Sequence, residues 1–338
     1  MLILPRARLL AAVVVLLLPV IAAASTVRII QTNAAGDNIH IIDPATNKVV
    51  GIINGIEVNH GVVVTPDGKS FLVTNESEST VDIVDVGTLK VVKQIKLSGH
   101  PNNLSISKDG RRAYVAIREA PGAVDIIDTQ SGTLAKSIPI PEVHNTFVSP
   151  DGKVVLAGSI AGKSITIIDS LSETITGTIT FDRGVRPLTF DTNADGSIKT
   201  LFVQLSDYNG FAVVDWAQRK EVNRIAIPEI PMAERHLEVL QNSPAHGIAV
   251  SPDGKTLWMN SKMNGRVYIY SLPDLKVIGE VRVGSHPDWL TFTPDGKSLY
   301  VANAGSDSVS VIDAASMREV TQIKVGQVPK RNYTAVLP

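Results

Sequence analysis

The 338-residue chain contains no cysteine, which excludes disulfides, thiolate metal sites, cysteine nucleophiles and c-type haem attachment. Only 5% of its residues are aromatic, and 32 Lys and Arg residues nearly balance 33 Asp and Glu residues. With neither a basic face nor aromatic residues for base stacking, the composition argues against nucleic-acid binding. A Gly-x-Ser-x-Gly elbow, a phosphate-binding glycine loop and a His-Glu-x-x-His motif are also absent. Their absence argues against a serine hydrolase, a nucleotide enzyme and a zincin peptidase.

Long apolar runs are missing from the chain except near its beginning. Arg6 and Arg8 precede an apolar run at 9–21, which is followed by the small residues 22–25. The run is shorter than the roughly 20 residues that a membrane-spanning helix needs, and the pattern is typical of a secretory signal peptide. We therefore expect a signal peptide at 1–24 and one exported domain at 25–338, periplasmic or secreted, with no membrane span after cleavage. An uncleaved anchor is the alternative.

A repeated turn dominates the rest of the sequence. Pro-Asp-Gly occurs at 66–68, 150–152, 252–254 and 294–296, and Asp-Gly alone occurs at 109–110 and 195–196. In such a turn proline presets φ, aspartate bonds its own backbone, and glycine accepts a positive φ. Strands rich in Val and Ile flank each copy, four strands to a unit, with a period of about 42 residues. This is the pattern of a β-propeller blade.

The two ends of the mature chain complement each other. Residues 28–33 match the second strand of a repeat, and 333–337 supply the missing first strand. Six whole copies and one blade shared by both termini predict an all-β, seven-bladed propeller with four antiparallel strands per blade. Such closure leaves no sheet edge open at either terminus. We expect a monomer.

Three segments carry a family resemblance: 71–75 (FLVTN), 300–305 (YVANAG) and 308–313 (SVSVID). They resemble the YVTN β-propeller repeat family, and the resemblance covers nearly the whole mature chain. It implies the propeller fold but is weakly specific for function. The family includes surface-layer proteins, exported proteins of unknown role and relatives of haem d1-binding propellers. Neighbouring seven-bladed families include lactonases and metal-dependent lyases.

Histidines recur at one position when the blades are aligned on the turn. The residue five before the Thr or Ser that opens the turn, here called the first ring, is His60, Asn102, His144, Leu188, His246, Asp288 and Lys330. Three imidazoles from alternating blades would converge on the axis. This predicts a three-histidine site for a divalent transition metal (Zn, Cu, Fe or Mn) with an open position, which could activate water. The structural alternative is that His60 and His246, each followed by Gly, simply belong to the repeat.

A second ring lies two residues earlier, on the same side if the chain there is extended. It consists of Val58, His100, Glu142, Arg186, Pro244, His286 and Val328. We expect Arg186, His100 and His286, with Asp288 of the first ring, to bind an anionic small molecule such as a carboxylate. The alternatives are an Arg186–Glu142 salt bridge and, for the two histidines, ordinary strand-entry turns.

One segment breaks the period: the spacing from Leu188 to His246 is longer than the others, and the excess lies at about 228–244. We expect this insertion to form a short helix over the channel mouth, the alternative being a tolerated surface loop. His236 within it, with Tyr208 and Lys262 at strand ends on the same face, are candidate general acids or bases.

Two functions follow from these patterns. The first is a metal-dependent lyase or hydrolase that acts on an anionic small molecule at the channel mouth. The second is a non-enzymatic periplasmic binding or scaffold propeller for an envelope protein partner or a redox cofactor. The sequence leaves open whether the protein is an enzyme, because both functions use the same fold.

Overall fold

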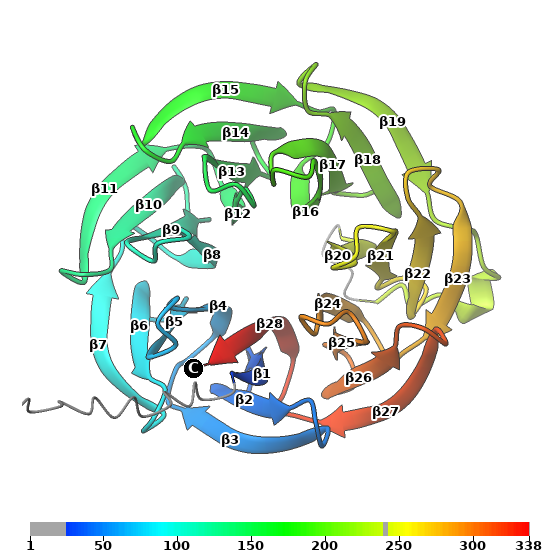
Figure 1. The fold of residues 1–338 in the computed structure, drawn as a ribbon, viewed down its shortest axis with the longest axis horizontal. Coiled ribbons are helices and arrows are strands. Elements are labelled where there is room, and N and C mark those ends of the chain that lie inside the picture. Colours follow the sequence, from blue (N-terminus) through cyan, green and yellow to red (C-terminus); the bar gives the residue numbers. More distant parts are fainter. Residues whose placement is uncertain (1–24, 239–242, 338) are drawn as a thin grey trace, which may run out of the picture.

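A computed structural model describes residues 25–238 and 243–337. The predicted signal peptide at 1–24 and part of the insertion, 239–242, lie outside the described residues. Seven four-stranded antiparallel sheets surround a central axis (Figure 1). The predicted seven-bladed, all-β propeller is therefore confirmed. Among the described residues, no helix is long and apolar enough to cross a membrane.

Each blade runs from an inner strand at the axis to an outer strand at the rim. Blades 1 to 3 are β4 (Asn59–Val64), β5 (Ser70–Asn75), β6 (Thr80–Asp85), β7 (Lys90–Lys96); β8 (Pro101–Ile106), β9 (Arg112–Ile117), β10 (Ala123–Asp128), β11 (Thr133–Pro139); and β12 (Val143–Val148), β13 (Val154–Ser159), β14 (Ser164–Asp169), β15 (Thr174–Thr180). Blades 4 to 6 are β16 (Val185–Thr192), β17 (Ile198–Leu205), β18 (Gly210–Asp215), β19 (Lys220–Ala226); β20 (Ala245–Val250), β21 (Thr256–Ser261), β22 (Arg266–Ser271), β23 (Val277–Arg282); and β24 (Pro287–Phe292), β25 (Ser298–Asn303), β26 (Ser308–Asp313), β27 (Arg318–Lys324). Blade 7 is β28 (Pro329–Leu337), β1 (Thr26–Asn33), β2 (Asn38–Asp43) and β3 (Lys48–Asn54).

Blade 7 closes the ring with strands from both ends of the chain. β28 pairs antiparallel with β1, from Thr26 opposite Leu337 to Gln31 opposite Asn332. The Thr32 hydroxyl lies 2.8 Å from the His60 carbonyl of blade 1, to which it donates. The predicted shared blade is thus present, and it places the first residues of β28 beside the axis.

The repeated turn forms as the sequence predicts. In blade 5 the Asp253 carboxylate accepts hydrogen bonds from the Ser251 hydroxyl (2.6 Å) and the Lys255 amide (3.1 Å). Gly254 follows with a φ of +71°, which a residue with a Cβ would adopt only under strain. The turn connects the first and second strands of the blade, on the face of the propeller opposite the candidate site.

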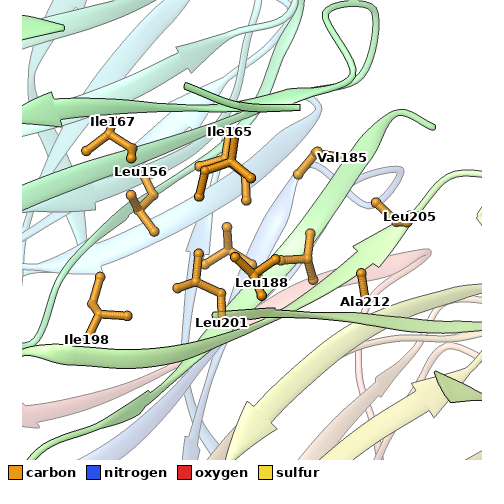
Figure 2. Packing of buried hydrophobic residues seen from close by; sticks show 12 residues of the cluster. Leu156, Ile165, Ile167, Val185, Leu188, Ile198, Leu201, Leu205 and Ala212 are labelled. Atoms are coloured by element: carbon orange, nitrogen blue, oxygen red, sulfur yellow. The ribbon is translucent and has the colours of Figure 1, made fainter. Parts of the chain in front are cut away.

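Apolar side chains fill the space between neighbouring blades. Figure 2 shows the cluster between blades 3 and 4, where Leu156 and Ile165 pack against Val185, Leu188 and Leu201. Burying each side chain of this size contributes about 1.5–3 kcal/mol. Each blade depends on its neighbours for this burial, because a four-stranded sheet has two faces to cover.

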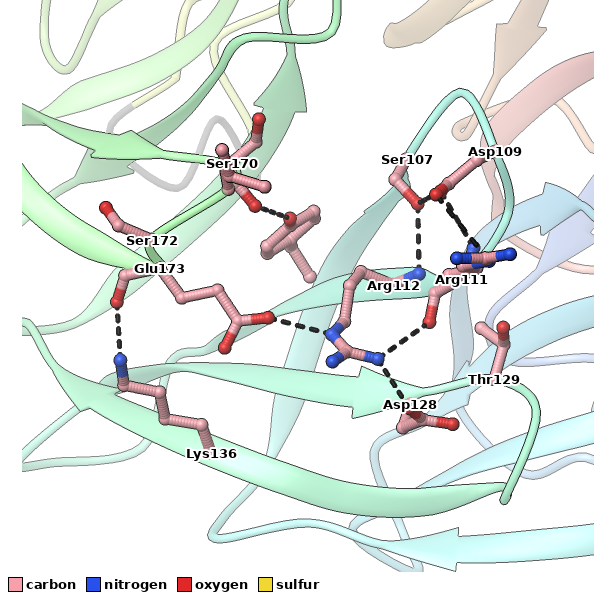
Figure 3. A network of polar contacts seen from close by, with 12 residues as sticks. Ser107, Asp109, Arg111, Arg112, Asp128, Thr129, Lys136, Ser170, Ser172 and Glu173 are labelled. Carbon is pink, nitrogen blue, oxygen red and sulfur yellow. Dashed lines mark hydrogen bonds and ion pairs between the residues drawn. The ribbon is translucent and has the colours of Figure 1, made fainter.

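Polar contacts also join adjacent blades near the turns. Arg112 of blade 2 donates to the Glu173 carboxylate of blade 3 (2.8 Å) and also pairs with Asp128 of its own blade (Figure 3). Lys136 donates to the Glu173 carbonyl at 2.6 Å. These groups are partly exposed, so each pair contributes at most about 1 kcal/mol.

The insertion differs from its prediction. It contains a single turn of 3₁₀ helix, η1 (Met232–Glu234), which Figure 1 shows at the rim. The Glu234 carboxylate accepts hydrogen bonds from Arg266 (3.0 Å) and Arg282 (2.6 Å). Arg266 and Arg282 hold the turn against the outer strands of blade 5. The described residues of the insertion therefore do not form the expected helix over the mouth. Of the insertion residues that the structure describes, Ser243 lines the axial cavity.

Candidate functional site

A polar cavity of about 270 Å³ lies at the axis, where the inner strands begin. Its lining residues are His60, Asn102, Arg118, His144, Arg186, Ser243, His246, Lys262, Asp288 and Lys330. Six of them belong to the first ring, so the structure brings His60, His144 and His246 together as the alignment suggested. Ser243 was not anticipated, because nothing in the sequence indicates where the insertion returns to the axis.

Leu188 is the first-ring residue that lies elsewhere. It packs in the apolar core between blades 3 and 4. The pairing of β16 with β17 shifts register between Val185 and Leu188. Arg186 of this irregular segment lines the cavity, and its Nε donates to the Ser206 hydroxyl at 2.9 Å. Burial lowers the pKa of Arg186, and the neighbouring Arg118 lowers it further.

His144 and His246 lie edge to face, with ring centroids 5.5 Å apart. Both are buried. Burial holds the pKa of each well below its ordinary value. Arg186 adds to this depression at His144, whereas Asp288 opposes it at His246. Both imidazoles are therefore neutral near pH 7 and can donate and accept hydrogen bonds.

His60 has a carboxylate partner. Its Nδ1 lies 2.6 Å from Oε1 of Glu76, at the end of β5. Burial lowers the pKa of His60, while the hydrogen bond to Glu76 partly offsets this effect. Glu76 thus orients the ring from behind the cavity wall.

A buried charge cluster forms the wall on the side of blades 5 to 7. The Asp288 carboxylate lies 3.0 Å from Lys262 Nζ and 3.8 Å from Lys330 Nζ. Burial alone would raise the pKa of Asp288, but Lys262 and then Lys330 hold it well below its usual range. Asp288 raises the pKa of Lys330, but burial and the charges of Lys262 and Arg331 outweigh it, so the net shift is downward.

Arg331 closes the cavity from below. Its guanidinium donates to Asn102 Oδ1 (3.1 Å), lies 3.3 Å from His246 Nδ1, and sits 3.9 Å from the centroid of the Trp289 ring. Burial lowers its pKa to about 10. Sequence reasoning missed this residue. The signal was available, because an arginine stands one position after the first ring, where blades 1 and 5 have glycine and blades 2 and 3 have asparagine.

The cavity carries an excess of positive charge. Four of its lining residues are cationic (Arg118, Arg186, Lys262 and Lys330), and Arg331 adds a fifth charge at the floor. Four carboxylates lie nearby: Asp288 in the wall, Glu76 behind His60, and Asp207 and Glu142, which interact with the charge of Arg186. A buried site with this balance of charge attracts an anion and repels a divalent cation.

The predicted metal site gains no support. Within residues 25–238 and 243–337, no group of three or more His, Asp or Glu side chains is arranged to hold a metal ion. Each imidazole Nδ1 already has a partner: Glu76 for His60, Asn145 for His144 and the Asp288 carbonyl for His246. Such partners on Nδ1 would still leave Nε2 for a metal. The cations that line the cavity, with Arg331 beside His246, nevertheless oppose a dication there.

The prediction that the second ring lines the cavity is wrong for every member except Arg186, because of the backbone conformation there. Its members Val58, Glu142, His286 and Val328 have φ values between +39° and +52°. The chain turns at these positions, so it is not extended and the side chains do not follow those of the first ring. Only Arg186 of this ring lines the cavity.

The two histidines of the second ring lie outside the cavity. His286 contacts the insertion, with its Nε2 2.8 Å from the Glu238 carbonyl. His100 is exposed, and its Nε2 lies 3.9 Å from a carboxylate oxygen of Glu119.

Of the three candidate acid–base residues, one lies at the cavity. Lys262 lines it, with its ammonium engaged by Asp288. His236 lies against blade 5, where its amide donates to the Met263 carbonyl, and its ring is 5.6 Å from that of His286. Tyr208 packs against the apolar core and under Arg224, whose guanidinium carbon is 5.5 Å from the ring centroid. Burial raises the pKa of Tyr208.

Sequence comparison gives partial matches. Residues 26–157 match the Cytochrome D1 heme domain family, and residues 235–333 match the Choice-of-anchor I domain, each less than half of the chain. A seven-bladed beta-propeller protein of Mycobacterium tuberculosis is 26% identical over 115 residues, which span 32% of this chain and 29% of the relative. The chain therefore aligns with less than a third of that relative's length.

Comparison with solved structures confirms the fold. Hydrazine synthase of Kuenenia stuttgartiensis superposes with a TM-score of 0.74 at 24% identity, over 85% of this chain and 92% of that one. The periplasmic gluconolactonase PpgL of Pseudomonas aeruginosa gives 0.72 at 19%, over 93% and 100%. The dihydro-heme d1 dehydrogenase NirN, solved with DHE, gives 0.67 at 16%, over 90% and 74%. The chain is thus a seven-bladed propeller similar to haem d1 domains and, in fold, to gluconolactonase-like proteins.

The axial cavity is too small to enclose a haem d1 macrocycle. Pockets that hold drug-sized ligands have volumes of about 300–1,000 Å³, and a macrocycle needs a pocket of this size. The cavity measures about 270 Å³ and is floored by Arg331 and walled by the Asp288 cluster. A smaller anion fits both its volume and its charge.

Proposed function

We propose that this protein is an exported seven-bladed propeller that binds an anionic small molecule, of the carboxylate class, at the axial mouth. The observation that carries the proposal is the cavity of about 270 Å³ lined by four cationic side chains and one carboxylate. Arg186 of blade 4 and Lys330 of blade 7 both line it and would hold the anion. The imidazoles of His60, His144 and His246, neutral through burial, would bond its hydroxyl or carbonyl groups.

Binding without metal chemistry agrees better with this cavity than a metal-dependent lyase or hydrolase. The cations that attract an anion would oppose a dication in the same space. The buried imidazoles are also weak bases, because a general base works best when its pKa lies near the working pH. Export is supported by the residues at 1–25 and by the fold shared with a periplasmic gluconolactonase.

The proposal is tested by calorimetric titration of residues 25–338 with citrate, D-gluconate and inorganic phosphate. We expect at least one of the three to bind. We expect Arg186→Gln and Lys330→Met to weaken that binding by at least tenfold each, about 1.4 kcal/mol. Arg111→Gln is the matched control, because it removes an exposed cation that pairs with Asp109 in a turn. We expect it to leave affinity unchanged.

Two results would contradict the proposal. One is that no anion of the panel binds, or that the two cavity variants bind as tightly as the parent. The other comes from elemental analysis of the purified protein. About one equivalent of transition metal, lost in His144→Ala, would show that the three-histidine metal site is real. That result would favour a metal-dependent lyase or hydrolase instead.

A further inference from the structure

The outer strand of each blade presents an open edge at the rim (Figure 1). Proteins protect such edges with charged side chains, because an uncharged edge offers its free N–H and C=O groups to another strand. Of the seven outer strands that the structure describes, six contain at least one Lys, Arg or Glu. The exception is β15 of blade 3, whose sequence is Thr-Ile-Thr-Gly-Thr-Ile-Thr. Its threonines and isoleucines have a high preference for strands, and none of its side chains carries a charge that would repel a neighbour.

The side chains of β15 leave this edge accessible. All but Gly177 and Ile179 are exposed, and Ile175 is 49% exposed. The turn that leads into the strand contains Leu171, at 94% the most exposed of the large apolar side chains in the described residues. β15 itself therefore carries no charge, and an exposed apolar side chain lies in the turn before it. Glu173, directly before the strand, pairs with Arg112 of blade 2.

The sequence of β15 is the same in both directions. In an antiparallel pair related by a two-fold axis at Gly177, each residue would lie opposite a residue of its own kind. Thr174 would face Thr180, Ile175 would face Ile179, and Thr176 would face Thr178 of the other copy. Matched Thr–Thr pairs are favourable across antiparallel strands. Ile179 is buried in the core of its own blade, so the exposed threonines would supply the side-chain contacts. A self-complementary strand at a two-fold axis is also the form that an isologous dimer interface takes.

A β-bulge does not set β15 apart from the other edges. The pairing of β15 with β14 shifts register between Ile167 and Ile168. The same shift occurs between the third and outer strands of all seven blades. Bulges are one protection against edge pairing and charges are another. Of the seven outer strands described, only β15 lacks charged side chains.

We propose that two copies of this chain associate edge to edge through β15, as a symmetric antiparallel strand pair. The proposal is independent of the anion site, which lies on the axis, and it replaces our expectation of a monomer. A seven-residue ladder buries less than the roughly 1,600 Å² of a standard interface. The dimer is therefore weak, and its population depends on protein concentration.

Sedimentation velocity between roughly 1 and 300 µM, a range that covers weak dimers, tests the association. We expect the parent chain to shift from monomer toward dimer across the range. Thr174→Lys/Thr180→Lys should abolish the shift. Lysine or arginine stands at the aligned first position in β3, β7, β19 and β27, so blades of this protein tolerate it. The matched control is Thr133→Lys/Ser137→Lys on the exposed outer strand β11, which should dimerise like the parent.

Because the chain has no cysteine, a single introduced thiol reports on the register. A Cβ at Gly177 would make only an ordinary contact, 3.6 Å from Ile167, and Gly177 does not need a positive φ. We expect Gly177→Cys to form a disulfide-linked dimer under mild oxidation, because the two thiols would meet at the axis. The matched variant on blade 2, Lys136→Cys, should stay monomeric.

The proposal is overturned if the parent sediments as a monomer over the whole range and Gly177→Cys does not cross-link. It is also overturned if the Thr174→Lys/Thr180→Lys variant dimerises like the parent, or if Lys136→Cys cross-links as fast as Gly177→Cys. Thermal unfolding of every variant confirms that it is folded before these results are compared.

Discussion

Asp288 shows how single residues in the cavity depend on one another. Its carboxylate is almost fully buried and is stabilised by Lys262 and, at longer range, by Lys330. A buried carboxylate is tolerated only when opposite charges and hydrogen bonds replace water. The pair also keeps the wall polar, which an anion site requires.

The first prediction concerns this pair. Lys262→Met should lower the free energy of unfolding by about 3–5 kcal/mol, because Asp288 keeps its charge and loses its nearest partner. Lys262→Met/Asp288→Leu should cost clearly less than the sum of the two single changes, since neither member of the pair is then left without the other. Urea denaturation of the three variants measures this coupling. Additive losses would mean that the two groups do not stabilise each other.

The second prediction follows from the buried histidines. The pKa values of His144 and His246 lie well below 6.5 in the folded protein, whereas in the unfolded chain they are about 6.5. Below pH 6.5 the unfolded chain therefore binds protons that the folded protein does not. The free energy of unfolding therefore keeps its full value above pH 6.5. Below pH 6.5 it falls by about 1.4 kcal/mol per pH unit for each histidine.

Urea denaturation between pH 7.5 and 5 measures that slope. His144→Gln should reduce it by about one histidine's share while leaving the stability at pH 7.5 less affected. His60 adds to the slope in the same direction, because its pKa is also lowered by burial. A stability that does not change below pH 6.5 would contradict the assignment of neutral buried imidazoles.

Among the structural elements, the turn was the most predictable. Asp253→Ala should destabilise the protein by about 1 kcal/mol, because the Ser251 hydroxyl and the Lys255 amide lose their shared acceptor. Asp274→Ala is the matched control. That exposed carboxylate is 4.0 Å from Lys276, so its removal should have almost no effect. Thermal and urea unfolding measure the stability of both variants. Equal losses of stability would show that the hydrogen bonds of the turn contribute nothing specific.

The contrast between the two rings shows what a sequence can predict of this site. The first ring could be placed because a fixed number of extended residues separates it from a recognisable turn. The second ring failed because Glu142 and His286 adopt a positive φ without being glycine, which no residue pattern announces. Arg331 was missed for a related reason: its burial depends on Trp289, Asn102 and His246, which come from three other blades. The seven-bladed ring was predictable, whereas contacts across the axis were not.

At the scale of the whole molecule, stability depends on closing the ring. β28 supplies the inner strand of blade 7, and Ala335 and Tyr333 pack in the core between blades 7 and 1. It also carries Arg331, which forms the floor of the cavity. Without β28, the strand β1 would lose its pairing partner, and the inner strands β4 and β24 of the neighbouring blades would lose the strand that they pack against.

The last prediction is that a chain of residues 25–328 does not fold cooperatively, whereas 25–338 does. The loss is far larger than that of one edge strand, because both the blade and the ring are opened and the apolar faces of two blades are exposed to water. Near-UV circular dichroism and urea denaturation compare the two chains. Adding a synthetic peptide of residues 329–338 at increasing concentration should restore the cooperative transition, since β28 is held by non-covalent pairing with β1. A truncated chain that unfolds as cooperatively as the full domain would show that six complete blades and an open seventh are sufficient, and that the shared blade does not hold the ring closed.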